Sequence, residues 1–356
     1  MTTTLPKTCT AAVIGVGKAG GGGPKGGGHA IGYTHAEMFQ GNARVRLAAG
    51  ADINAENLAA FKAKFAVPGG WSDYRAMLRE LQPDLVSIGT YVGLHKQIIE
   101  DAARAGVKGI LCEKPFLASP AEVQAVRRIV AETGVKLVVG HMRRYRPAFE
   151  RARELYNDGA VGQPVLCTAG IEGWDLSEWG SHWLDMIRFF HLDRPVQWVF
   201  GQARVRDLRG YGHAMEEHAL AYFEFEDGGN GRLDGGRPMD GGTLTLLGSA
   251  GVIRVKGEAR VRLENAKGLA EEDFSNHPRH KAIWHELLAE LLAWVEGGPE
   301  PRVGHTSMFQ TSELNLGAYL SAVAGDRIDL PLSGKWQEYA QWPVEELAKR
   351  HVMRDA

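Results

Sequence analysis

The chain has 356 residues, of which 44% are apolar and 24% are charged, so it is long enough for two domains with buried cores. Its 41 basic and 43 acidic residues give a net charge of −2 and form neither a basic stripe for nucleic acid nor an acidic tail. We therefore expect a protein that acts on a small molecule and has no nucleic-acid partner.

The first part of the chain alternates short apolar segments with segments that carry apolar residues at helical spacing. The expected strands are residues 11–16, 45–51, 85–90, 109–112 and 135–140. The expected helices between them are residues 55–65, 95–105 and 120–133, the last of which begins with a capping serine and a proline, Ser119 and Pro120. This alternation predicts a doubly wound parallel sheet of the Rossmann type in a domain of residues 1–141.

The pattern changes after residue 141, where short alternating segments and glycine-rich turns follow one another. The expected strands are residues 165–171, 219–226, 231–233, 243–247, 252–256 and 259–263, the later ones forming an antiparallel meander. The expected helices are residues 147–157, 182–190, 283–295 and 310–324. The sequence thus predicts an α+β second domain of residues 142–356 with an open, mainly antiparallel sheet.

A glycine-rich turn follows the first strand. Gly15, Gly17 and Gly20 match the pattern G-x-G-x-x-G of dinucleotide-binding folds, which expects an acidic residue about 20 positions later. Asp52 ends the second strand but has that spacing from Gly32, not from Gly20. We therefore expect Gly15 and Gly17 at the phosphates, Gly32 packing the helix against the strand, and Asp52 at the ribose. Because a carboxylate repels a 2′-phosphate, NAD is favoured over NADP.

The residues from about Lys18 to His29 then form an insertion in the phosphate loop. They are either a glycine-rich tether or a cover over the pyrophosphate that brings Lys18 or Lys25 near its charge. The sequence leaves both readings open.

The tripeptide Glu113-Lys114-Pro115 follows the apolar run of residues 109–112. Ligands of such folds bind at the carboxyl ends of the strands, so this position delivers an ammonium group to the same edge of the sheet as the glycine turn. Lys114 can there contact a reacting oxygen.

Several segments resemble the Gfo/Idh/MocA oxidoreductases, the family of glucose-fructose oxidoreductase and inositol dehydrogenase. They are the glycine-rich start, residues 88–95, 112–115 and 140–147, and Trp179-Gly180-Ser181-His182-Trp183-Leu184-Asp185. The resemblance covers nearly the whole chain. It implies that Thr90, His95 and Glu113 belong to the cofactor site and that Lys114 lies near nicotinamide and substrate.

In that family a histidine of the second domain handles the proton and follows an aspartate by four residues. The matching positions here hold His182 and, as a departure, Glu178. Alcohol oxidation needs a base and a cation beside the developing alkoxide, and an imidazole with an ordinary pKa near 6.5 suits the base better than an amine near 10.4. We expect His182 to take the proton and Lys114 to supply the charge. If the helix begins early enough, Glu178 shares a face with His182 and orients its ring.

Aromatic and cationic residues near these positions suit a carbohydrate. Trp174, Trp179 and Trp183 offer ring faces to the C–H surface of a sugar, although tryptophans are also common packing residues. Trp179 is the strongest candidate because it lies between Glu178 and His182. By the resemblance, Arg143 and Tyr145 point to the junction of the domains, where the family binds substrate.

The remaining features concern the compartment and metal binding. Cys9, Cys112 and Cys167 are odd in number and lack the C-x-x-C spacing of a metal or redox site, which fits a reducing compartment. The N-terminus has no basic stretch before an apolar run, and no run approaches the roughly 18 residues of a membrane span. The histidines follow no defensible metal-site pattern. We expect a cytoplasmic protein with no metal and no membrane partner.

These observations favour an NAD-dependent dehydrogenase or reductase that acts on a ring hydroxyl of a sugar, glycoside or cyclic polyol. An alternative is a glycoside hydrolase that uses NAD transiently, by ring oxidation, elimination and re-reduction. A third possibility is a non-catalytic sugar or nucleotide sensor, against which the presence of both Lys114 and His182 argues. The resemblance also suggests a homodimer or homotetramer formed through the open sheet.

Overall fold

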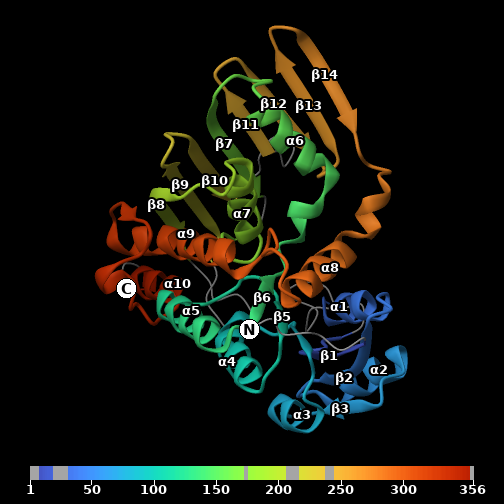
Figure 1. Cartoon of the computed structure of the whole chain (residues 1–356). Helices are drawn as coiled ribbons and strands as arrows, with labels where there is room; N and C mark the ends of the chain where they lie inside the picture. The colour runs from blue at the N-terminus through green and yellow to red at the C-terminus, as the bar shows by residue number, and fades with distance from the viewer. Residues whose placement is uncertain (1–7, 19–30, 172–174, 206–215, 237–243, 353–356) are drawn as a thin grey trace.

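The structure of the protein is a computed structural model, which describes residues 8–18, 31–171, 175–205, 216–236 and 244–352. Two β-sheets lie one above the other, and the helix α9 (His305–Ala324) packs against both (Figure 1). Most of the predicted phosphate-loop insertion, including Lys25, and Trp174 lie outside the described residues.

The first sheet is parallel and has the strand order β3-β2-β1-β4-β5-β6, which confirms the predicted doubly wound fold. The strands are β1 (Cys9–Ile14), β2 (Val45–Ala51), β3 (Gly69–Trp71), β4 (Leu85–Ile88), β5 (Gly109–Cys112) and β6 (Lys136–Val139). The helices are α1 (Ile31–Gln40), α2 (Ala55–Phe65), α3 (Tyr74–Leu81), α4 (Val92–Arg104) and α5 (Pro120–Thr133). The sequence missed β3, because its Gly-Gly-Trp segment contains no apolar run.

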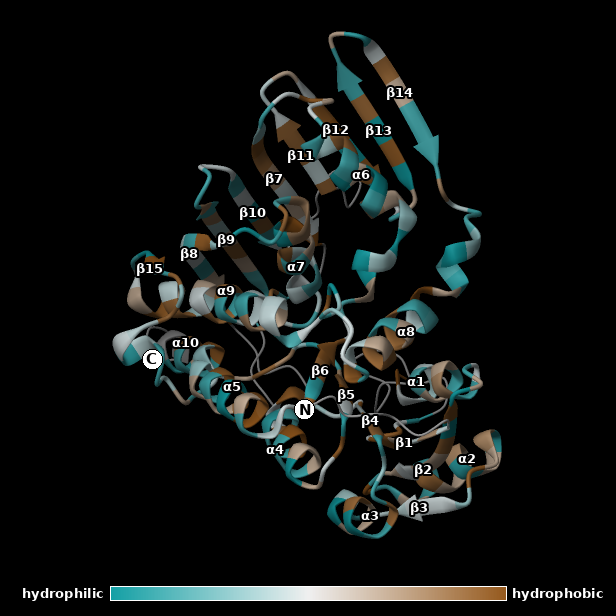
Figure 2. Ribbon diagram, in the orientation of Figure 1, coloured by the Kyte–Doolittle hydropathy of each residue, from teal (hydrophilic) through white to brown (hydrophobic). Residues whose placement is uncertain are grey.

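Helices on both sides bury the central strands, which explains their nearly continuous apolar sequences. In β4, β5 and β6 most residues are apolar, and these strands are largely brown in Figure 2. The predicted cap of α5 is confirmed, since the Ser119 hydroxyl accepts a hydrogen bond from the backbone N–H of Glu122 at 3.3 Å.

The second sheet has nine strands in the order β14-β13-β12-β11-β7-β10-β9-β8-β15. Their bounds are β7 (Pro164–Ile171), β8 (Val196–Arg204), β9 (His218–Phe225), β10 (Asn230–Gly235), β11 (Leu244–Gly248), β12 (Gly251–Lys256), β13 (Arg260–Asn265), β14 (Gly268–Asp273) and β15 (Ile328–Asp329). The sheet is mainly antiparallel, as predicted, but it is not a simple meander. The strand β7 lies between β11 and β10 and runs parallel to β10, and an alternating pattern identifies a strand without naming its neighbours.

The helices α6 (Pro147–Asn157) and α7 (Gly180–Phe190) pack against the second sheet. Every residue of α7 is buried, so this helix is part of the core between the two sheets. The remaining helices are η1 (Met142–Tyr145), η2 (Pro278–Lys281), η3 (Gly334–Trp336) and α10 (Pro343–Val352). Within the part of the chain that the structure describes, none of the helices has the length and apolar composition of a membrane span.

The position of helix α8 (Ile283–Val295) in the sequence had suggested that it completes the second domain, but the helix packs on the first sheet. Its buried residues Leu287 and Leu291 share a core cluster with Leu85 and Leu111 of the first sheet. The segment after α8 also joins that sheet, because the backbone N–H of Val139 donates to the carbonyl of residue 303 at 3.0 Å. An apolar helix pattern does not reveal which sheet the helix covers, and the domain division at residue 141 stays a prediction.

Candidate active site

A cavity of about 430 Å³ opens at the carboxyl ends of β1 and β4, where the strand order reverses. Its lining includes Gly15, Gly17, Asp52, Thr90 and Tyr91. Gly15 has φ +76°, and a Cβ atom there would lie 2.7 Å from Cγ2 of Thr90. The turn therefore requires glycine, and its bare backbone leaves room for the close approach of a phosphate.

Gly32 occupies the packing position that was predicted for it. A Cβ atom on this residue would lie 2.6 Å from the carbonyl oxygen of Val16 and 2.9 Å from that of Gly15. The first turn of α1 therefore lies directly against the loop after β1. This contact gives the loop and the helix the arrangement of a dinucleotide-binding turn, with Gly32 acting through packing.

Asp52 stands at the edge of the cavity. Its Oδ2 accepts a hydrogen bond from the backbone N–H of Gly17 at 3.0 Å, and its Oδ1 accepts one from that of Asn54 at 2.8 Å. The carboxylate thus joins the loop after β1 to the start of α2. On the opposite wall the buried hydroxyl of Thr90 has no hydrogen-bond partner among the described residues.

His95 and Glu113, predicted for the cofactor site, are not among the residues that line this cavity. The ring nitrogens of His95 lie 2.9 Å and 3.0 Å from the backbone carbonyls of Thr90 and Phe116. Glu113 lies 3.2 Å from Nε2 of His35 and accepts a hydrogen bond from the backbone N–H of Lys114 at 3.2 Å. Both side chains are buried and brace the loops after β4 and β5.

Lys114 reaches from the end of β5 to the segment before α7. Its ammonium donates to the backbone carbonyl of Glu178 at 3.1 Å and lies 3.3 Å from the Oε2 of the same residue. The side chain of Lys114 is 15% exposed and that of Glu178 is 9% exposed. A partly buried ammonium from the first sheet therefore meets a buried carboxylate from the segment before α7.

The predicted pairing of Glu178 and His182 on one helix face requires helix α7 to extend back to Glu178, which it does not. Helix α7 begins at Gly180, so Glu178 lies in the preceding turn and its carboxylate contacts Lys114. Burial raises the pKa of Glu178 to about 7, although the ammonium of Lys114 opposes this rise. Glu178 therefore titrates in the range where an active-site acid or base works.

His182 lies in the first turn of α7 and is buried. Its Nδ1 has no hydrogen-bond partner among the described residues. Burial, followed by the charges of Arg143 and Lys114, holds the pKa of His182 well below its usual value. The imidazole is therefore neutral at ordinary pH, and a neutral ring can accept a proton or a hydrogen bond.

The sequence analysis did not single out His141, which follows β6. Its ring meets that of His182 edge to face, with centroids 5.2 Å apart. Its Nδ1 lies 3.9 Å from Oδ2 of Asp185, beyond hydrogen-bond distance, and burial lowers the pKa of His141 to about 4. Its position at the carboxyl end of a strand of the first sheet was the one available signal.

Arg143 and Trp179 lie together, but Tyr145 does not join them. The Arg143 guanidinium carbon lies 5.3 Å and 5.2 Å from the ring centroids of Trp179 and Trp183. Tyr145 is fully buried, and its hydroxyl donates to Glu290 of α8 at 2.7 Å. Its aromatic ring belongs to the core beneath the first sheet, so the structure does not place Tyr145 in the predicted substrate group.

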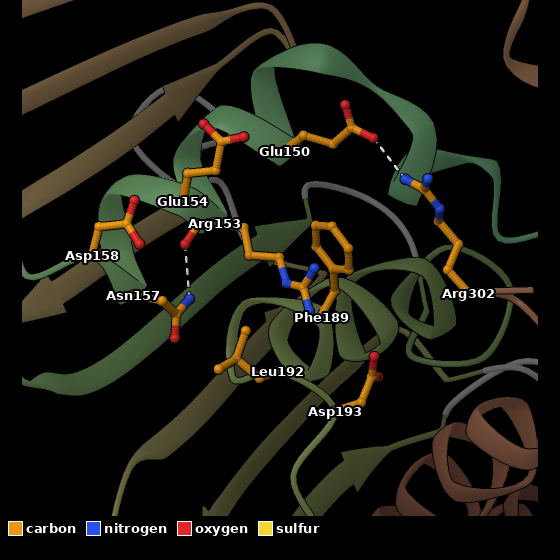
Figure 3. A pocket seen from close by; sticks show the side chains of 9 residues that line it. All are labelled: Glu150, Arg153, Glu154, Asn157, Asp158, Phe189, Leu192, Asp193 and Arg302. Atoms are coloured by element: carbon orange, nitrogen blue, oxygen red, sulfur yellow. Dashed lines mark hydrogen bonds and ion pairs between the residues drawn. The ribbon is translucent and has the colours of Figure 1, made fainter.

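A second cavity of about 630 Å³ lies between α6 and the end of α7 (Figure 3). Arg153 stacks on Phe189 at 4.4 Å, and Arg302 donates to Glu150 at 2.6 Å. None of the residues predicted for the site lines this cavity. The first cavity, with Lys114 at the end of the neighbouring strand, is the better candidate.

The doubly wound sheet and its glycine-lined cavity define a nucleotide-binding oxidoreductase fold. Residues 10–141 match the Gfo/Idh/MocA family, described as an oxidoreductase family with an NAD-binding Rossmann fold. This match covers the part of the chain that forms the first sheet, and it agrees with the resemblance that the motifs suggested.

The chain is similar in sequence to several dehydrogenases over most of its length. It is 26% identical to D-apiose dehydrogenase of Paraburkholderia graminis over 78% of this chain and 81% of that protein. It is 28% identical to inositol 2-dehydrogenase of Rhizobium meliloti over 76% of this chain and 87% of that protein. Among solved structures, levoglucosan dehydrogenase in complex with NADH and levoglucosan shares the fold, with a TM-score of 0.77, 18% identity, and coverage of 91% of this chain and 100% of that one.

Proposed function

We propose that this protein is an NAD-dependent dehydrogenase that transfers a hydride between nicotinamide and a ring carbinol of a sugar or cyclic polyol. The observation that carries the proposal is the contact of Lys114 with the segment that bears Glu178 and His182, at the strand ends beside the glycine-lined cavity. Relatives named as dehydrogenases of inositol and apiose support this substrate class.

The residues of the cavity suit NAD. Gly15 and Gly17 offer bare backbone to the phosphates, while Asp52 faces the cavity as an acceptor for ribose hydroxyls. The carboxylate of Asp52 would repel the 2′-phosphate of NADP, which favours NAD. Bound nicotinamide supplies a hydride acceptor, and the chain supplies the groups that handle the proton and the charge.

In the oxidation direction, His182 accepts the proton of the substrate hydroxyl. Its neutral imidazole has an Nδ1 with no hydrogen-bond partner within the described ranges, and Lys114 places a positive charge beside the oxygen as negative charge develops there. Glu178 holds the ammonium in place when it is ionised. Arg143 and the ring of Trp179, which is 37% exposed, are the candidates for contacts with the sugar.

The outer face of the second sheet supports a homodimer or homotetramer. Phe200 pairs across the ladder with Tyr222, and Leu247 lies on the same face, opposite the one covered by α7. Phe200 and Leu247 are 41% and 42% exposed, respectively. A second copy would cover these apolar side chains. The three cysteines are buried and form no disulfide with one another, which supports a reducing, cytoplasmic compartment.

The experiment is a screen of sugars, polyols and glycosides with NAD and with NADP. It follows nicotinamide absorbance and release of the aglycone together. We expect NADH to accumulate with oxidised product, and Lys114→Ala to lower kcat by about a thousandfold, the size of a lost oxyanion contact. Lys108→Ala is the matched control, because Lys108 precedes the same strand and pairs with Asp84. Release of aglycone without NADH would instead favour the hydrolase.

A further inference from the structure

The turn that places Glu178 next to Lys114 is stabilised by hydrogen bonds to a buried aspartate, Asp175. Oδ1 of Asp175 accepts hydrogen bonds from the Ser177 hydroxyl at 2.7 Å and from the backbone N–H of Glu178 at 2.5 Å. Asp175 is 2% exposed, and its Oδ2 has no hydrogen-bond partner among the described residues. Burying a carboxylate oxygen without a hydrogen-bond partner costs free energy of folding, so other interactions of the turn must offset this cost.

Three side chains from other parts of the chain, Glu216, Asn315 and Tyr319, also stabilise this turn. Oε1 of Glu216 accepts from the backbone N–H of Leu176 at 2.5 Å, and Asn315 of α9 donates to the Leu176 carbonyl at 2.8 Å. Tyr319, one turn further along α9, donates to both carboxyl oxygens of Glu216, at 2.8 Å and 3.0 Å. Both backbone groups of Leu176 are therefore held by buried side chains.

Burial favours the protonated form of Glu216 in this cluster. Glu216 is 1% exposed, and burial, followed by repulsion from Asp175, raises the pKa of Glu216 to about 8. The hydroxyl of Tyr319 opposes this rise through its hydrogen bond. Glu216 is therefore mostly protonated at neutral pH.

We propose that Asp175, Glu216 and Tyr319 are positioning residues for the dehydrogenation, because together they hold the turn that keeps Glu178 on the ammonium of Lys114. This inference rests on the proposed function. The three residues act through the backbone of residues 176–178, and they belong to neither the nucleotide cavity nor the contacts of Lys114 itself. They also connect α9, which packs on both sheets, to the site.

The test measures amide hydrogen exchange of the peptide that spans residues 175–180 in the full-length protein with NAD present. The variants are Tyr319→Phe and Glu216→Leu, which remove the hydroxyl or the carboxyl group. The matched control is Tyr156→Phe, which removes another buried hydroxyl, bonded to the backbone of Leu247 at 3.2 Å. We expect exchange of the peptide to accelerate by about tenfold or more in the two variants and to stay unchanged in the control.

The catalytic measurement separates positioning from a general structural role. We expect kcat to fall by roughly tenfold in Tyr319→Phe and further in Glu216→Leu, with the dissociation constant for NAD unchanged. Glu216→Gln should recover most of the loss, because an amide reproduces the protonated carboxyl group. If the turn loosens while kcat stays at the wild-type value, or if Gln is as damaging as Leu, the proposal is wrong.

A third measurement needs no substrate. Lys114 in the wild-type protein should react slowly with an acetylating reagent, because its ammonium is bonded to Glu178, and mass spectrometry follows the labelling of its peptide. Faster labelling of Lys114 in Tyr319→Phe than in Tyr156→Phe supports the positioning role even if no sugar or polyol is oxidised, in which case the proposed function alone fails. Equal labelling in the two variants contradicts the positioning role.

Discussion

Helix α7 carries two groups of buried polar residues that differ in how fully they are hydrogen-bonded. Near its start, Glu178 and His182 are buried with a raised and a lowered pKa, and Nδ1 of the histidine has no hydrogen-bond partner in the described part of the chain. Further along, Asp185 binds Arg144 in a bidentate pair, with distances of 2.8 Å and 2.7 Å, and the same guanidinium binds Asp193 at 2.8 Å and 2.7 Å. Arg144 is fully buried and its N–H groups are occupied.

The difference separates a structural charge network from a chemical one. A buried ion pair whose hydrogen bonds are all made holds elements together and has nothing left to offer a ligand. A buried group with an unused atom and a perturbed pKa keeps capacity for a substrate. Asp185 belongs to the fully paired network. For this reason it stays outside the proposed chemistry, although it lies in a segment that resembles the family.

The largest effect is expected from breaking the structural network. Arg144→Met removes the guanidinium that pairs with the buried carboxylate of Asp185 and the half-buried carboxylate of Asp193, which should lower the free energy of unfolding by about 3 to 5 kcal/mol. Urea denaturation measures this loss. Arg254→Met, which removes a half-exposed pair with Glu264 on the second sheet, is the control and should change stability little. Equal losses in both variants would remove the distinction between the two kinds of charge.

The next effect tests whether an unused ring nitrogen is sufficient to mark the site. His191 follows the end of α7 and is buried, and neither of its ring nitrogens has a hydrogen-bond partner among the residues that the structure describes. Its ring stacks on that of Phe225, with centroids 4.1 Å apart. We expect His182→Gln to lower kcat by about a hundredfold or more, whereas His191→Gln should leave kcat within about threefold of the wild type. If both lower kcat equally, proximity to Lys114 is not the deciding feature.

Local signals in the sequence predicted a large part of this site. The end of β5 had to bring Lys114 to the edge of the sheet, and the spacing to Asp52 identified Gly32 as the packing glycine, because strands and their turns have fixed geometry. The alternating segments likewise predicted both sheets and most helices.

The remainder depends on contacts between distant parts of the chain. The partner of Glu178 is Lys114, and the partner of Glu216 is Tyr319, which lies about a hundred residues further along, and no local pattern encodes such a meeting. His141 was missed for the same reason, since only the packing of η1, which follows His141, against α7 reveals its contact with His182. The placement of α8 on the first sheet is a further example.

A third prediction sharpens the comparison through pH. Because the pKa of Glu178 in the folded protein, about 7, exceeds its ordinary value of 4.5, the folded state binds this proton more tightly than the unfolded state. Stability should therefore fall as pH rises from about 4.5 to about 7, by at most about 3 kcal/mol. Glu178→Gln should match the wild type near about pH 5 and exceed it near about pH 8, while its kcat falls. Urea denaturation at both pH values measures the difference in free energy of unfolding between the variant and the wild type. If the pKa of Glu178 were not raised in the folded protein, this difference would be the same at both pH values.

The smallest effect concerns Asp52, which combines features of both groups. Its oxygens are partnered, as in Asp185, but they accept only backbone N–H groups at the edge of an open cavity, so they can also meet a ligand. Asp52→Ala should weaken NAD binding by roughly tenfold, about 1.4 kcal/mol, and should raise the relative affinity for NADP because the repelling charge is gone.

Fluorescence titration with the two cofactors measures this change of preference. Asp84→Ala is the matched control, because Asp84 also accepts a backbone N–H, from Thr10 at 2.8 Å, but it precedes β4 at the opposite end of the sheet. That variant should lose stability without changing the ratio of NAD to NADP affinity. If the ratio shifts as much in Asp84→Ala as in Asp52→Ala, cofactor preference reflects the general stability of the fold, and Asp52 belongs with the structural charges.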